Sequence, residues 1–102
     1  MYSTEVHDLR FEWDPYKAEA NRRRHGVSFD EAQSAFEDEH ALVIEDPAHS
    51  REEDRFVLLG MSRRPRVVVV VHCYREAEST IRLISARRAT RAEARQYAAR
   101  RP

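Results

Sequence analysis

The sequence predicts a single α+β domain, and three observations carry this prediction. Apolar and polar residues alternate with the period of β-strands in five separate segments. Three other segments begin with residues that cap helices and then repeat apolar residues at helical spacing. The connections between the last four strand segments are short, which favours an antiparallel meander. A chain of 102 residues is long enough for one hydrophobic core.

Helices are expected after Asp14, Ser28 and Thr90, because each of these side chains can accept a hydrogen bond from the first turn. Pro15 stands where its missing amide costs nothing, and Gly26 ends the first helix. The residues expected to face inward are Phe29, Ala32, Ala35 and Phe36 in the second helix and Ala94, Tyr97 and Ala98 in the third.

The expected strands are Leu9–Trp13, Ala41–Glu45, Arg55–Met61, Arg66–Tyr74 and Thr80–Ala86. The predicted order is therefore β-α-α-β-β-β-β-α, with a twisted, mainly antiparallel sheet and two helices on one of its faces. We expect residues 1–10 to be an N-terminal extension and residues 11–102 to form the domain.

Charge is divided unevenly along the chain. Residues 1–47 hold 5 basic and 12 acidic side chains, a formal charge of −7, whereas residues 48–102 hold 13 and 6, a charge of +7. Every basic residue except Lys17 is arginine, whose planar group binds phosphate with two parallel hydrogen bonds. A coding bias toward arginine explains the same composition.

Other features limit the class of protein. Neither a membrane-spanning run nor a secretory leader is evident, so a cytoplasmic protein is expected. Cys73 is the single cysteine, which excludes an internal disulfide. No metal-binding motif or phosphate-binding glycine loop stands out, and we predict no metal and no cofactor.

The segment Ile81–Arg88 combines a strand pattern with cationic side chains. Regular alternation places Ile81 and Leu83 on one face and Arg82 on the other, together with Ala86. Arg82 then needs an anionic partner. Two partners remain open, namely a substrate phosphate or a carboxylate, the latter from Glu76, Glu78 or the acidic first half of the chain.

Four segments closely resemble BrnT-type toxins, in the family's order and at its usual spacing. They are Phe11–Phe29, Asp54–Phe56 with Gly60, Val69–Arg75 and Ile81–Thr90. The resemblance implies a RelE-like fold and a ribonuclease toxin of a type II toxin-antitoxin pair, which cleaves RNA and inhibits translation and growth. Residues 1–10 and Cys73, where the family often has threonine, depart from the pattern.

The resemblance also implies partners. They are an RNA substrate and a cognate, BrnA-like antitoxin of the ribbon-helix-helix type, with operator DNA contacted only through the antitoxin complex. The run of five valines, Val67–Val71, is compatible with an interface in a toxin homodimer and also with a buried central strand.

Cleavage of RNA without a metal requires a base, cationic groups beside the phosphate and an acid. The candidate catalytic residues are His72, Arg75, Arg82 and Arg87, to which the resemblance adds Arg55 as a second phosphate clamp. The candidate RNA-binding residues are Lys17, His25, Arg88 and Trp13. Ser85 is expected to support the backbone. The sequence does not assign the base or the acid.

Each candidate also has a purely structural interpretation. His72 could be a histidine of the sheet edge, and Arg55 part of a local network of surface ion pairs. Trp13 could pack in the core beside aromatic neighbours instead of stacking on a base. Lys17 could be a solvated helix residue, and His25 could interact with the C-terminal end of its helix.

Two other functions compete with the ribonuclease. A non-catalytic binding module, whose arginine-rich face holds an acidic partner protein, requires the same charge distribution. Direct DNA binding as a repressor is disfavoured, because no helix-turn-helix spacing is evident.

Overall fold

The computed structural model describes residues 9–46, 54–75 and 79–100 with their side chains, and the backbone of residues 2–6. The elements in the described part of the chain are β1 (Tyr2–Val6), β2 (Leu9–Trp13), α1 (Pro15–His25), α2 (Phe29–Ser34), the 3-10 helix η1 (Ala35–Glu37), β3 (Leu42–Glu45), β4 (Arg55–Met61), β5 (Val67–Arg75), β6 (Thr80–Arg88) and α3 (Arg91–Arg100). The predicted α+β class is confirmed. None of the helices in this part of the chain is long and apolar enough to cross a membrane.

The described strands form one six-stranded sheet in the order β1-β2-β6-β5-β4-β3. Strands β3 to β6 pair with their sequence neighbours in antiparallel orientation, so the predicted meander is confirmed. β2 instead lies parallel to β6, with Glu12 opposite Arg82. Two helices and three strands separate β2 from β6 along the chain, and parallel pairing requires such a long connection.

Strand β1 was not expected from the sequence, which was interpreted there as an extension. β1 pairs antiparallel with the whole of β2, from Tyr2 opposite Trp13 to Val6 opposite Leu9. Tyr, Thr and Val within β1 favour strands, so a signal for this element was present. The domain boundary expected at residue 10 lies within β2, in the middle of this hairpin.

The predicted helix caps are present. The Asp14 carboxylate accepts a hydrogen bond of 2.8 Å from the backbone N–H of Tyr16. The Ser28 and Thr90 hydroxyls each accept one from the N–H three residues later, at 3.0 and 3.2 Å. Gly26 follows α1 with a φ of 72°, a left-handed conformation that glycine adopts without strain. Local sequence therefore sets the ends of these helices.

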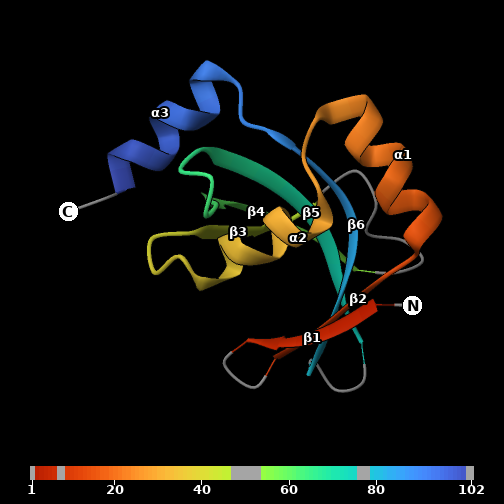
Figure 1. Cartoon of the computed structure of the whole chain (residues 1–102). Coiled ribbons are helices and arrows are strands. Elements are labelled where there is room, and N and C mark those ends of the chain that lie inside the picture. Colours follow the sequence, from red (N-terminus) through yellow and green to blue (C-terminus); the bar gives the residue numbers. More distant parts are fainter. Residues whose placement is uncertain (1, 7–8, 47–53, 76–78, 101–102) are drawn as a thin grey trace.

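One side of the sheet, which we call the helix face, is covered by α1, α2 and η1. Figure 1 shows α2 in front of the sheet and α1 beside β6. The core between them is formed by Phe11, Trp13, Val27, Phe29, Ala32, Ala35, Leu58, Val68, Val70, Ile81, Leu83 and Ala86. Phe36 packs against this core, so the inward residues predicted for the second helix are confirmed.

Helix α3 lies on the opposite side of the sheet. Tyr97 packs there with Leu59 and Val69 in a second, smaller core. The Tyr97 hydroxyl also donates a hydrogen bond to the Asp38 carboxylate. The prediction that Ala98 faces inward is wrong, because α3 is anchored mainly through Tyr97 and Ala98 is exposed. This side of the sheet is therefore covered only in part.

A buried carboxylate fixes α2 to the sheet. The side chain of Glu31 is 2 % exposed and accepts hydrogen bonds of 2.6 and 2.7 Å from Arg66 and of 2.7 Å from the Ser62 hydroxyl. The hydrogen bonds from Arg66 hold the pKa of Glu31 below its usual value. Arg66 is thus engaged in a structural ion pair.

Candidate functional site

On the side of the sheet that bears α3, one row of residues crosses four strands. Glu12 of β2 lies opposite Arg82 of β6, Arg82 opposite Cys73 of β5, and Cys73 opposite Arg55 of β4. Residues directly opposite one another in a sheet project to the same face. With neighbouring strands about 4.8 Å apart, the backbones of Arg55 and Arg82 lie roughly 10 Å apart.

Strand β6 is irregular at Ile84. Val71 pairs with Ser85, whereas His72 pairs with Leu83, so Ile84 has no partner on β5. This arrangement is a β-bulge, in which the extra residue shifts the alternation of side chains in the rest of the strand.

The bulge brings two arginines to one face. In a regular strand Arg82 and Arg87, five residues apart, would point to opposite faces. Here Arg82 pairs with Cys73 and Arg87 with Val69, and these two partners share one face of β5. The alternation expected from the sequence placed Ala86 beside Arg82, and this is corrected, because Ala86 is fully buried in the core of the helix face.

We call the resulting surface the arginine face. Its charged and hydroxyl-bearing members include Glu12, Arg55, Arg75, Arg82, Ser85 and Arg87, together with Arg10 and Thr80.

Glu12 lies between two of these arginines. Its Oε1 atom is 3.5 Å from Nε of Arg75 and 3.6 Å from Nη1 of Arg82. The carboxylate expected to pair with Arg82 is therefore one from the first half of the chain, whereas Glu76 and Glu78 lie outside the described residues. Both contacts exceed the length of a good hydrogen bond, so they are ion pairs between Glu12 and the two guanidinium groups.

Arg87 is held more firmly. Its two terminal nitrogens donate hydrogen bonds of 2.8 and 2.9 Å to the two carboxylate oxygens of Glu93 in α3. These bonds lower the pKa of Glu93 to about 2 and raise the pKa of Arg87. The pair ties the start of α3 to the end of β6, which gives Arg87 a structural function.

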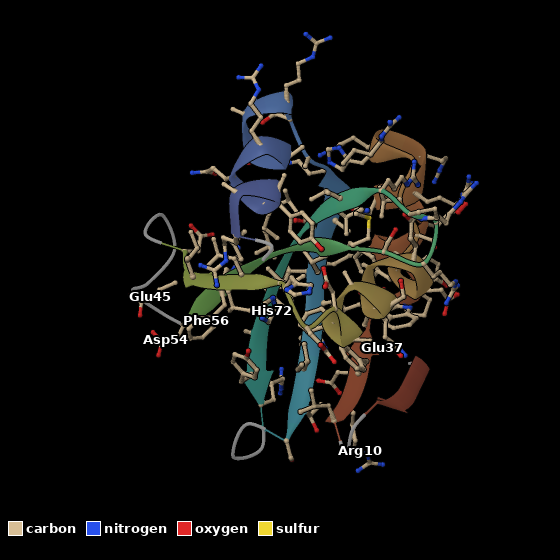
Figure 2. All side chains as sticks on the ribbon, turned by 90° about the vertical axis from the view of Figure 1, so that its left-hand side faces the viewer. Arg10, Glu37, Glu45, Asp54, Phe56 and His72 are labelled. Atoms are coloured by element: carbon tan, nitrogen blue, oxygen red, sulfur yellow. The ribbon has the colours of Figure 1, made fainter. Side chains whose placement is uncertain are left out.

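His72 does not reach the arginine face. It lies on the helix face with 0 % exposure, 4.8 Å from Phe36 and 6.2 Å from Phe56 between ring centroids. Figure 2 shows it in the middle of the molecule beside Phe56. Its Nδ1 lies 3.2 Å from the carbonyl oxygen of Val70. Burial lowers the pKa of His72 to about 4, so the ring is neutral near pH 7.

Two candidate RNA-binding residues also lie away from the arginine face. Trp13 is 6 % exposed and packs edge-on against Phe29 at 5.9 Å, so little of its ring is open to a base. Arg88 is exposed, but it pairs with Val68, a residue of the helix face, and therefore projects from that side. The structure thus favours the structural interpretation of Trp13.

Lys17 and His25 of α1 lie close to β6. Both residues, with Ser85, line a hollow of about 200 Å³ between α1 and β6. The side chains of Lys17 and His25 therefore face the same hollow.

The arginine face has the groups needed to act on a phosphodiester. Guanidinium groups bind phosphate through paired, charge-assisted hydrogen bonds. A carboxylate among them can accept a proton from a hydroxyl group. In the described part of the chain, no group of three or more His, Cys, Asp or Glu side chains is placed to hold a metal ion. Fold and face together define a small α+β domain with a cationic surface on one side of its sheet.

Comparison with known proteins identifies the family. The family model described as "Ribonuclease toxin, BrnT, of type II toxin-antitoxin system" matches residues 13–93, and the chain belongs to this family. The 1.1 Å crystal structure of the Brucella abortus ribonuclease toxin BrnT superposes with a TM-score of 0.62 and 22 % identity, over 79 % of this chain and 96 % of that one. This likeness confirms the fold. No curated protein sequence matches the chain.

Sequence reasoning missed Glu12 as a site residue. A signal for it was present, because Phe11 and Trp13 on either side are apolar and alternation therefore places Glu12 on the face away from the core. Its proximity to Arg75 and Arg82 depends on the parallel pairing of β2 with β6, which was not predicted.

Proposed function

We propose that the arginine face is the active site of a metal-independent endoribonuclease, and that cleavage of RNA at this face inhibits translation and growth. The observation that supports it best is the bulge at Ile84, which brings Arg82, Ser85 and Arg87 to the face that also carries Glu12. Bulges commonly redirect side chains beside active sites.

The chemistry uses the RNA's own 2′-hydroxyl. Glu12 accepts the proton of this hydroxyl, and the oxygen attacks the adjacent phosphorus while the bond to the 5′-oxygen breaks. The leaving 5′-oxygen takes a proton from solvent, so the products are a 2′,3′-cyclic phosphate and a 5′-hydroxyl. Arginine remains protonated in proteins and does not serve as the base. Arg82 and Arg75 instead stabilise the charge that develops on the phosphate.

The other arginines contribute differently. Arg55 is two strands from Arg82 in the same row and extends the cationic surface across the sheet. Arg87 would have to exchange its hydrogen bonds to Glu93 for a phosphate before it could contact the RNA. His72, Trp13 and Arg88 have no part in this mechanism.

A toxin of a type II system has an antitoxin partner, and we propose that this partner covers the arginine face. A BrnA-like antitoxin of the ribbon-helix-helix type would place acidic side chains against Arg75 and Arg82, as Glu12 already does within the chain. Contact with operator DNA would then be made by the antitoxin. The toxin acts in the cytoplasm, where its RNA substrate is found.

The test is cleavage of a single-stranded RNA by the purified chain in the presence of EDTA. Arg82→Ala should lower the rate about 10²- to 10³-fold by removing charge stabilisation. Glu12→Gln should lower it about 10²- to 10⁴-fold by removing the base. The matched control is Arg95→Ala, which removes an arginine exposed on α3 and should cleave like the wild type.

Two results would contradict the proposal. If RNA stays intact while the wild-type protein binds an acidic partner through Arg82, the chain is a non-catalytic binding module. If folded Arg82→Ala and Glu12→Gln variants cleave at the wild-type rate, the chemistry takes place elsewhere.

A further inference from the structure

Strand β6 is paired with β5 along its whole length, but on its other side a strand accompanies it for only the first three residues. β2 pairs with it only from Thr80 to Arg82, because the chain turns at Asp14 into α1. Beyond that point Asn21 of α1 takes the place of a strand at Ala86, with hydrogen bonds of 2.8 Å to its carbonyl and 3.1 Å from its N–H. Asn21 is buried and also donates to the Val27 carbonyl at 3.0 Å, so α1 is firmly fixed beside β6.

This arrangement leaves a hollow between α1 and the part of β6 that β2 does not pair with. Its lining is formed by Lys17, Ala20, Asn21, Arg24 and His25 of α1 and by Ile84 and Ser85 of β6, and its volume is about 200 Å³. Lys17 and His25 are four residues before and after Asn21, and Arg24 is three after it, so these side chains share the helix stripe that faces β6. The bulge residue Ile84 is at the hollow, next to the hydroxyl of Ser85 on the arginine face.

The chemistry of this lining is that of an anion site. Lys17 and Arg24 are positively charged at neutral pH, and Ser85 and His25 offer further hydrogen-bond donors. The lining contains no carboxylate. Within residues 9–46, 54–75 and 79–100, the side chains of Lys17, Arg24 and His25 have no hydrogen bond or ion pair. Arg22, on another side of the same helix, is by contrast paired with Glu19 at 2.6 Å.

The helix dipole does not account for this group of cations. Arg24 and His25 are in the last turn of α1, where a positive charge is favoured. Lys17 is in the first turn, where the dipole disfavours a cation. Its position is instead explained by the hollow, since it completes the cationic rim on the side nearer the end of β2.

We propose that this hollow binds a phosphate group of the RNA that neighbours the scissile phosphate; the inference rests on the proposed function of the arginine face. Ser85 is three residues from Arg82 along β6, a distance of roughly 10 Å. β2 does not pair with β6 beyond Arg82, so an RNA strand that lies over Arg82 and crosses the edge of β6 beside Ser85 would reach the hollow within a short length of its backbone. The volume is below the 300 Å³ or more that is usual for a whole small-molecule ligand, and suits one phosphate rather than a helix of a partner protein.

The test compares RNAs of two lengths. For an RNA of about ten nucleotides, Lys17→Ala and Arg24→Ala should each raise KM about tenfold and leave kcat nearly unchanged, as expected for loss of a charge-assisted contact that is equally strong in the ground and transition states. For a dinucleotide with only the scissile phosphate, both variants should cleave like the wild type. Arg23→Ala is the matched control, because it removes the same charge from an exposed position of α1 outside the hollow.

Binding provides a second measurement that does not require cleavage. The association constant of the longer RNA can be measured by fluorescence anisotropy at several salt concentrations. In each of the two variants, the plot of log association constant against log salt should be less steep by about 0.7, as for one lost phosphate contact to a single strand. Arg23→Ala should leave the slope within the wild-type error. If the wild type binds but cleaves no RNA, the proposed function fails while this slope still tests the hollow.

Three outcomes would overturn the inference. In the first, Lys17→Ala and Arg24→Ala affect RNA binding no more than Arg23→Ala does. In the second, inorganic phosphate binds the wild type and is lost in both variants while RNA binding is unchanged, which would make the hollow a site for a free anion. In the third, the variants lose affinity for the antitoxin but not for RNA, which would make it a protein-docking site.

Discussion

The two faces of the sheet are built from the same strands and differ in what covers them. On the helix face, Phe11 and Ile81 are at most 1 % exposed beneath α1, α2 and η1. On the arginine face their sequence neighbours Glu12 and Arg82 have side chains that are 23 % and 26 % exposed. Because alternation separates the two sets, this small domain can keep its stability on one face and its chemistry on the other.

The difference between the faces can be measured. Substitutions on the helix face should change the free energy of unfolding, whereas substitutions on the arginine face should change RNA cleavage. Three further variants test this division, in order of decreasing expected effect.

Phe11→Ala should have the largest effect. The side chain is completely buried and contacts Phe36 edge-on, with 5.1 Å between ring centroids, so its removal leaves a cavity and should cost about 3–5 kcal/mol. Urea unfolding monitored by circular dichroism gives this value. Arg75→Ala, on the other face, should change stability by less than about 0.5 kcal/mol. Equal losses in the two variants would break the comparison.

His72→Phe should remove a sensitivity to acid. Because the pKa of His72 in the folded protein is about 4 instead of 6.5, the fold resists protonation of this side chain. The free energy of unfolding therefore has its full value above about pH 6.5 and decreases as the pH falls toward 4, by roughly 3 kcal/mol. Unfolding measured at pH 7 and pH 4 should show this loss in the wild type and less of it in the variant.

The same variant tests the candidate catalytic role of His72. Glu31 and Glu93 also affect stability in acid, but both carboxylates are present in the wild type and in His72→Phe. The difference in acid sensitivity between these two proteins is therefore due to His72. RNA cleavage by His72→Phe at pH 7 should equal that of the wild type. A folded variant that has lost cleavage would place His72 in the mechanism, despite its position on the helix face.

Arg87→Ala should have a smaller effect on stability than Phe11→Ala and His72→Phe, and it will sharpen the boundary between the faces. Its ion pair with Glu93 is partly exposed, at 42 % and 28 %, and should contribute about 1 kcal/mol or less. The contribution is present above the usual pKa of Glu93 and is lost as the pH falls toward 2. Thermal unfolding with and without Glu93→Gln gives the coupling in a double-mutant cycle.

Cleavage by this variant should fall less than tenfold, because Arg87 is already neutralised by Glu93. A loss as large as that of Arg82→Ala, in a protein with α3 still in place, would instead assign Arg87 to the site.

Much of the fold could be predicted because its signals are local. Capping by Asp14, Ser28 and Thr90 depends on residues within one turn, and strand alternation depends on neighbours two positions apart. The inward direction of Ala98 was predicted incorrectly, since it depends on how α3 docks and not on helical spacing alone. β1 had a local signal, but the resemblance to a family that begins later in the chain obscured it.

The site could be predicted only in part. Arg55, Arg75 and Arg82 were identified from the sequence and are brought to one face, whereas His72 and Trp13 are buried on the other. A histidine that follows a run of valines looks the same in sequence whether its strand position faces the core or the solvent.

The sequence by itself determined the class, the helix caps, the antiparallel meander and the concentration of arginine in the second half of the chain, because these depend on composition and on near neighbours. Only the tertiary structure decided the bulge at Ile84, the approach of Glu12 to Arg75 and Arg82, and the hollow between α1 and β6. Each of these depends on pairing between elements far apart in the chain, which local propensity does not encode.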